Sequence, residues 1–310
     1  MLSRRLLRVK VMQMIYANTQ QGETEYSKIE NELYRSITKA HELYHFILLL
    51  PVALQRHAAK RIENGKSKLR PSKEELDPNM KFVNNKLVLQ LANNNMLSDF
   101  SAKGGLSWYD EDDLLKSVYA RFCNNDLYKE YMSTRVGTYE EDKAFIIRFM
   151  TKELPAYAFF FDGLEGINIY WNDEIEFVIS MAIKTLKQFT EGNDQVELMP
   201  LFKDADDEDF VKTLLRKTLS TADDTFELIK TFSRNWDPDR VAAMDVLLIQ
   251  LATAEMMSFK EIPIRVTLNE YIELSKYYST NKSSIFINGL LEKIVRYMVE
   301  AKKLNPSQLQ

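Results

Sequence analysis

Apolar residues recur at helical spacing along almost the whole chain, and this pattern predicts an all-α protein. Residues 3–18 form one amphipathic stretch, which Gly22 is expected to end. A second stretch runs from Tyr26 to Leu50, and Pro51 is expected to kink or end it. Further helices are expected near residues 80–98, 108–134, 138–154, 172–190, 206–219 and 221–233.

Two polar segments separate these helices. Residues 62–79 hold Gly65, Pro71 and Pro78, and residues 191–200 are also turn-rich, so both are expected to be connectors.

A shift of 65 residues aligns parts of the chain with themselves. The aligned identities are Asp142 with Asp207, Phe145 with Phe210, Lys152 with Lys217, Leu154 with Leu219, Phe161 with Phe226, Trp171 with Trp236, and Leu186 with Leu251. The pattern suggests duplication of a helical half-domain, although helical sequences also align by chance.

The C-terminal region begins with a helix that is apolar on nearly every side. Asp237-Pro238-Asp239 reads as its N-cap and first turn. The expected buried stripe is Val241, Met244, Leu248 and Leu251. Asp245 interrupts this helix, so we expect its carboxylate at the edge of the buried face or paired with a cation.

Two more helices follow. Residues 267–270 (Thr-Leu-Asn-Glu) match a capping box that would open the first of them. Gly289 lies inside the last helix, where glycine costs ~1 kcal/mol relative to alanine, and a close helix crossing would explain it.

Composition places the chain among ordinary globular proteins. It has 310 residues, 45% hydrophobic and 28% charged. Cys123 is its one cysteine, which excludes an intramolecular disulfide framework and fits a reducing cytoplasm. The longest apolar stretch, Phe46 to Leu54, falls far short of the ~20 residues of a membrane span, and no signal peptide is recognisable. A cytoplasmic protein without membrane contact is expected.

Charge is distributed unevenly around a net −4. No acidic residue precedes Glu23, whereas Arg4, Arg5, Arg8 and Lys10 do. A second basic stretch spans residues 56–73. Its cations are Arg56, Lys60, Arg61, Lys66, Lys68, Arg70 and Lys73, against a lone Glu63. Such asymmetry suggests a polyanion site, and solvated helix faces are the alternative.

The three N-terminal arginines share one helical face. Arg8 is four residues from Arg4 and three from Arg5, so the three charges repel one another. They also oppose the dipole of the helix N-terminus. A phosphate backbone would reverse the sign of both effects, and arginine can stack on exposed RNA bases.

The C-terminal block resembles the NusB family of transcription antitermination factors from about Phe210 to Tyr297. The matching elements are Phe210 with Leu214-Leu215, residues 244–248 (Met-Asp-Val-Leu-Leu), Ile262-Pro263, Asn269-Glu270, Glu273-Leu274, Lys276 and residues 286–289 (Phe-Ile-Asn-Gly). The N-terminal Arg4-Arg5, Arg8 and residues 13–16 (Gln-Met-Ile-Tyr) match the arginine-rich opening of the family. The resemblance implies an all-α fold of two helical bundles, with residues 1–50 and 201–310 as the NusB-like core and residues 51–200 as an inserted helical region.

The resemblance also implies function. Family members bind the boxA element of nascent RNA together with NusE, a small-subunit ribosomal protein, and support antitermination during ribosomal RNA synthesis in the elongation complex. Carried over by position, the RNA side is Arg4, Arg5, Arg8, Gln13, Lys282 and Phe286. Tyr16 and Asp245 fall where the family meets NusE. No enzymatic activity, cofactor or metal is implied, and a homodimer is possible.

Two positions depart from the family pattern. Gln250 replaces the usual arginine, and Val246 replaces a basic residue beside the aspartate. These departures place the details of partner binding in doubt. The alternative is an RNA-binding or scaffold module with no antitermination role, which would bind RNA without NusE.

A metal-dependent protease is the rival from another class. Residues 41–45 (His-Glu-Leu-Tyr-His) match the H-E-x-x-H pattern, in which two imidazoles bind zinc and the glutamate is the general base. A third ligand would have to come from a residue such as His57 or Glu63. The motif has three fixed residues and occurs by chance, so ordinary helix positions are the favoured interpretation.

Overall fold

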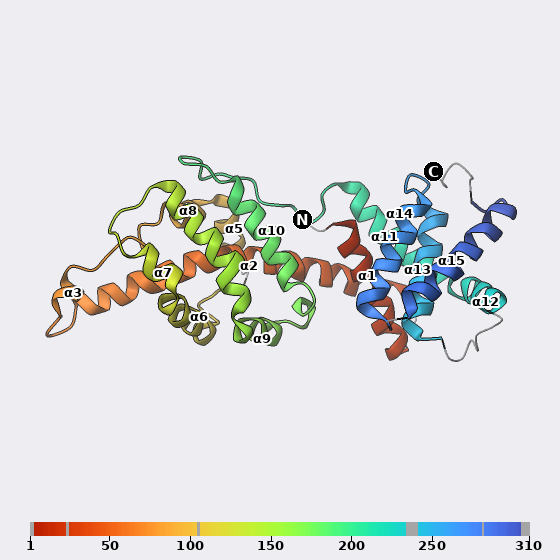
Figure 1. Ribbon diagram of the computed structural model, residues 1–310, viewed down its shortest axis with the longest axis horizontal. Helices are drawn as coiled ribbons and strands as arrows, with labels where there is room; N and C mark the ends of the chain where they lie inside the picture. The colour runs from red at the N-terminus through yellow and green to blue at the C-terminus, as the bar shows by residue number, and fades with distance from the viewer. Residues whose placement is uncertain (1–2, 23–24, 104–105, 234–240, 281, 305–310) are drawn as a thin grey trace. The chain divides into compact units, whose positions relative to one another are not determined.

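The computed structural model describes residues 3–22, 25–103, 106–233, 241–280 and 282–304, and every regular element within them is helical (Figure 1). This confirms the all-α prediction. None of the described helices combines the length and apolar character that a bilayer span requires. The chain divides into two compact units: residues 38–200 form unit 1, and residues 2–37 with 201–310 form unit 2.

Unit 2 combines the beginning and the end of the chain. Its helices are α1 (Arg4–Gln21), the first part of α2 (Tyr26–Lys66), α11 (Ala205–Ser220), α12 (Ala222–Phe232), α13 (Ala243–Ser258), α14 (Ile264–Tyr278) and α15 (Ser283–Glu300). Helix α13 packs against α1, α11, α12, α14 and α15, so it is the central helix of the unit. Figure 1 shows α1 and α11 beside α13 and α14.

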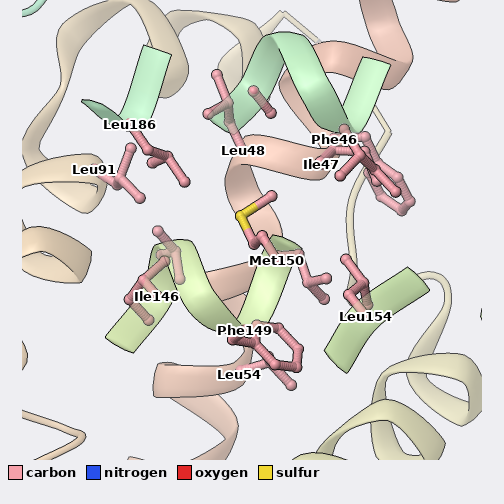
Figure 2. Close-up of a cluster of buried hydrophobic side chains, with 14 of the residues drawn as sticks. Phe46, Ile47, Leu48, Leu54, Leu91, Ile146, Phe149, Met150, Leu154 and Leu186 are labelled. Carbon is pink, nitrogen blue, oxygen red and sulfur yellow. The ribbon is translucent and has the colours of Figure 1, made fainter. Parts of the chain in front are cut away.

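Unit 1 contains the remaining helices. They are the rest of α2, α3 (Lys73–Leu76), α4 (Lys86–Asn93), α5 (Asn95–Ala102), α6 (Asp112–Asn124), α7 (Asp126–Tyr131), α8 (Tyr139–Arg148), a π-helical turn at Phe149–Glu153, a 3-10 turn at Leu154–Ala156, α9 (Ala158–Ile167), a 3-10 turn at Ile169–Trp171 and α10 (Ile175–Gln188). Figure 2 shows its core, where Phe46, Leu48 and Leu54 of α2 lie among Met150, Phe149 and Leu186.

The second helix does not end at Pro51, which was one of the two outcomes expected for this residue. Helix α2 continues through Pro51 to Lys66. Leu50 and Val52 on either side of the proline are both buried in the core of unit 1. Burial of these side chains offsets the hydrogen bond that proline cannot donate, because tertiary packing supplies most of the stability of a protein helix. Residues 38–50, assigned by sequence to the NusB-like core, fall in unit 1.

Helix starts in the C-terminal region also differ from expectation. The expected N-cap at residues 237–239 lies outside the described residues, and α13 begins at Ala243. The capping box at Thr267 is wrong, because α14 begins earlier, at Ile264 after Pro263. Glycine at position 22 ends α1 as expected, with φ at 70°, in the left-handed region that glycine favours.

Helix order agrees with the 65-residue shift. When 65 is added to its first residue number, α8 starts within one residue of α11 and α9 within one residue of α12. By the same shift, α10 starts within three residues of α13. Asp142 and Asp207, one of the aligned pairs, are both buried carboxylates. Trp236 lies outside the described residues, so the duplication stays a prediction.

Candidate nucleic-acid and partner interface

The arginine face of α1 is paired with acidic residues of three other helices. Arg4 Nε donates to Asp207 Oδ1 of α11 at 2.9 Å. Arg5 donates to both carboxylate oxygens of Glu270 on α14, at 2.8 and 2.7 Å. Carboxylates of unit 2 therefore neutralise part of the positive charge that RNA phosphate was expected to neutralise. These pairs also attach the N-terminal helix to the C-terminal block.

Arg8 forms the most enclosed of these pairs. Its Nε and Nη2 donate to the two oxygens of Glu255 on α13 at 2.7 and 2.6 Å, and only 4% of its side chain is exposed. Thr267 Oγ1 and the Tyr271 hydroxyl donate to the same carboxylate at 2.9 and 2.8 Å. Glu255 thus has four hydrogen bonds, from α1 and α14, and we call these four residues the Glu255 network.

Charge and burial determine protonation in the Glu255 network. Burial lowers the pKa of Arg8, but the hydrogen bonds and charge of Glu255 outweigh this, and the net pKa is raised. Burial and the nearby Glu255 carboxylate raise the pKa of Tyr271 well above its usual value. Arg8 is therefore charged and Tyr271 protonated at neutral pH, which is the combination that satisfies Glu255. Sequence reasoning missed Glu255, although it interrupts the same apolar helix as Asp245.

Two of these arginines lie close to the ring of Phe210. The guanidinium carbons of Arg4 and Arg8 lie 5.3 and 5.2 Å from its centroid, and the ring is buried. Cation–π attraction of this kind adds about 0.5–2 kcal/mol per contact. Of the three arginines, Arg5 is the most accessible, with 55% of its side chain exposed.

The carboxylate of Asp245 accepts hydrogen bonds from hydroxyl groups. Pairing with a cation was one of the two expectations for it. Ser279 Oγ donates to its Oδ1 at 2.5 Å and Ser283 Oγ to its Oδ2 at 2.9 Å. The residue is 6% exposed and lies in the first turn of α13, where the helix dipole favours a carboxylate. It joins the start of α13 to the end of α14 and the start of α15. Tyr16, the other residue assigned to the partner, is 39% exposed on α1.

A groove of about 420 Å³ lies along α15. Its lining residues are Phe232, Ser233, Lys282, Ile285, Phe286, Gly289, Leu290 and Lys293. Lys282 is exposed and Phe286 half-buried, and both were assigned to RNA from the sequence. Lys293 Nζ donates to the carbonyl oxygen of Phe232 at 3.3 Å. The groove lining thus combines the rings of Phe232 and Phe286 with the ammonium groups of Lys282 and Lys293.

Gly289 keeps this groove open. Among the described residues, no heavy atom outside its own helix lies within 4 Å of where a Cβ would be, so they do not form the expected close helix crossing. The missing side chain widens the hollow beside Phe286. Gln13, the remaining residue assigned to RNA, is half-buried on α1.

Gly289→Ala is expected to raise the free energy of unfolding by about 0.5–1 kcal/mol, because the helix gains propensity and nothing is displaced. Urea denaturation measures this change. Gly22→Ala is the matched control and should destabilise instead, because its φ of 70° strains any residue with a Cβ. Loss of stability in Gly289→Ala would contradict the open groove.

The H-E-x-x-H residues have other contacts. His41 Nε2 donates to the carbonyl oxygen of Met199 at 2.9 Å, and His45 Nδ1 donates to that of His41 at 2.8 Å. The Glu42 carboxylate pairs with Lys39. Within the described part of the chain, no group of three His, Cys, Asp or Glu side chains is arranged to hold a metal. The described residues therefore provide no third zinc ligand, which the protease interpretation requires.

The NusB family model matches residues 177–296, which includes the whole of α11 to α14 and most of α15. The chain is 37% identical over 107 residues to the transcription antitermination protein NusB of Salinibacter ruber, covering 34% of this chain and 67% of that protein. The chain belongs to the NusB family. No solved structure matches it.

Other relatives match a similar C-terminal portion. The NusB protein of Natranaerobius thermophilus is 37% identical over 93 residues, which cover 30% of this chain and 67% of that protein. The NusB protein of Dictyoglomus turgidum is 44% identical over 78 residues, which cover 25% of this chain and 54% of that protein. The family match starts at residue 177, upstream of the start near Phe210 expected from sequence, and leaves most of unit 1 unmatched.

Proposed function

We propose that this protein is a transcription antitermination factor that binds boxA-like nascent RNA together with the ribosomal protein NusE, and that it supports ribosomal RNA transcription. Family membership carries the proposal, because the similar proteins from Salinibacter ruber and Natranaerobius thermophilus are named transcription antitermination proteins. We assign it no enzymatic activity. The joining of residues 2–37 with 201–310 in one unit supports it, since both sequence blocks of the resemblance then belong to one body.

The proposed RNA surface is the groove of α15 together with the accessible part of α1. Phe286 offers a ring on which a base can stack, and Lys282 offers a charge for phosphate. Arg4 and Arg5 remain partly exposed beside their acidic partners, so they can share a phosphate. Arg8 is enclosed, and in this proposal it acts by holding α1 against α13.

The proposed NusE surface includes Tyr16 and Asp245. Tyr16 is exposed enough to contact a partner directly. Asp245 is almost fully buried, so its part in the proposal is to fix the start of α13 through Ser279 and Ser283. Gln250, which departs from the family pattern, donates to the carbonyl oxygen of Ala222 at 3.1 Å and so contributes to the packing of α12.

The test is fluorescence anisotropy on a boxA-like RNA, with and without NusE. The wild-type protein should bind weakly alone and more tightly with NusE. Lys282→Ala combined with Phe286→Ala should weaken binding about tenfold or more, as expected for loss of one stacked base and one phosphate contact. Lys302→Ala with Tyr277→Ala is the control, because it removes one exposed cation and one exposed ring outside the groove.

Separate outcomes decide the two parts of the proposal. Equal affinity of the groove variant and its control would overturn the RNA assignment. Tyr16→Ala should reduce the gain from NusE while leaving binding to RNA alone unchanged. RNA binding by the wild type that NusE does not improve would instead favour the RNA-binding module without an antitermination role.

A further inference from the structure

Unit 1 contains a pocket of about 210 Å³ in the region that the family match does not cover. Its lining residues are Leu49, Val52, Ala53, Arg56, His57 and Lys60 of α2, with Ser101, Leu106, Ser107, Trp108, Tyr109, Asp112 and Leu115. The indole of Trp108 is fixed in place, because its Nε1 donates to the Phe46 carbonyl oxygen at 2.8 Å and its ring stacks on Phe46 at 4.0 Å. The interior is therefore apolar and aromatic.

One wall of the pocket is cationic. Arg56 and Lys60 are four residues apart on α2 and both are exposed, so their charges repel. No carboxylate of the described residues forms an ion pair with either of them. The N-terminal arginines have such partners, as described above. A bound anion would remove the repulsion at Arg56 and Lys60.

The lining also provides a hydrogen-bond acceptor, Asp112, whose carboxyl pKa is lowered by its hydrogen bond with Lys116 and by the nearby His57 and Lys60. Asp112 Oδ2 pairs with Lys116 Nζ at 2.5 Å, which leaves Oδ1 as the second carboxylate oxygen of this residue. Ser101 and Ser107 place hydroxyl groups in the same lining. Burial, with the nearby Arg61, lowers the pKa of His57, so this ring is neutral at pH 7 and adds no charge. The pocket therefore combines an anion-binding side, an aromatic interior and a carboxylate acceptor.

These three features fit the parts of a nucleotide. Phosphate suits Arg56 and Lys60, a planar base suits the aromatic interior, and an exocyclic amino group suits a carboxylate. We propose that the pocket binds one nucleotide of single-stranded RNA, with an amino-bearing base inside and its phosphate at Arg56 and Lys60. Only the RNA source of that nucleotide rests on the proposed function. Uracil lacks the amino group and should bind less well.

The experiment uses the full chain carrying Lys282→Ala and Phe286→Ala, so that the α15 groove does not contribute. Labelled hexanucleotides of adenylate, cytidylate and uridylate are titrated, and free AMP serves as competitor. Arg56→Ala with Lys60→Ala should weaken adenylate binding about tenfold. Arg70→Ala with Lys73→Ala is the matched control, with the same loss of one arginine and one lysine outside the pocket, and should change affinity less than twofold.

Two further variants keep the test specific. Ala53→Phe fills the pocket without changing charge and should abolish the binding that Arg56 and Lys60 support. Asp112→Asn should reduce the preference for adenylate and cytidylate over uridylate. A hexanucleotide that binds far more tightly than AMP identifies RNA as the source, and similar affinities identify a free nucleotide in the same pocket.

Equal losses in the pocket variant and its control would overturn the proposal and leave a general basic surface. No hexanucleotide binding by this protein, while the wild type binds boxA RNA with NusE, would overturn the pocket alone. Hexanucleotide binding that the pocket variants abolish, with no boxA binding by the wild type, would support the pocket and contradict the function proposed for unit 2.

Discussion

Glu255→Ala is expected to lower the free energy of unfolding by about 3–5 kcal/mol. The substitution leaves the buried Arg8 guanidinium without the carboxylate to which it donates, with Glu270 remaining at 3.8 Å, and it removes the acceptor of Thr267 and Tyr271. An uncompensated buried charge costs more than the ion pair itself contributes, which is why the loss is large. Urea denaturation followed by circular dichroism measures it, with each transition fitted separately because the chain has two units.

The matched control is Glu270→Ala. This glutamate provides no countercharge as close to Arg8 as Glu255 does: it lies 3.8 Å from Arg8 Nη1, and its hydrogen-bonded partner Arg5 is more than half exposed. Exposed pairs contribute about 0–1 kcal/mol, so the control should lose little. Replacing both Arg8 and Glu255 with apolar residues of similar size should recover most of the stability, because no buried charge then remains. Equal losses in Glu255→Ala and Glu270→Ala would contradict the role given to the Glu255 network.

Local sequence pattern predicted most helices because apolar spacing and turn residues act over short distances. Gly22 ended α1 as expected, and the helical segments near 172–190, 206–219 and 221–233 lie close to α10, α11 and α12. Pro51 misled the prediction because the cost of proline is local, whereas the burial of Leu50 and Val52 depends on unit 1 as a whole. Thr267 matched a capping box, but its hydroxyl donates to Glu255 on another helix.

The candidate site was less predictable because it depends on pairs distant in sequence. Arg8 and Glu255 are 247 residues apart, and no local pattern connects them. Repulsion among Arg4, Arg5 and Arg8 was visible from sequence, but their acidic partners on α11, α13 and α14 were not. The criterion applied to Asp245, a carboxylate in an apolar helix, would also have identified Glu255. Lys282 and Phe286 stay predictions, although the structure places both in one groove.

Acidification from pH 7.5 to pH 5 is expected to destabilise unit 1 by roughly 2 kcal/mol through His41. Burial, together with the nearby His45, lowers the pKa of His41 from 6.5 to about 4, although its hydrogen bond to Met199 acts in the opposite direction. The folded state therefore keeps His41 neutral between these two values, whereas the unfolded chain takes up a proton below pH 6.5. Stability falls as the pH drops below 6.5 and levels off below about 4. Burial lowers the pKa of His45 as well, so it adds a loss of the same sign.

Urea denaturation at pH 7.5, 6.5, 5.5 and 5.0 measures this dependence. His41→Gln is the informative variant, because its amide can still donate to the Met199 carbonyl oxygen but does not titrate in this range. The loss between pH 7.5 and 5 should shrink by roughly 2 kcal/mol in this variant. His57→Gln is the control: His57 lies near the surface of α2, so its removal should leave most of the dependence intact. An unchanged pH profile in His41→Gln would show that the His41 imidazole does not stay neutral in the folded protein.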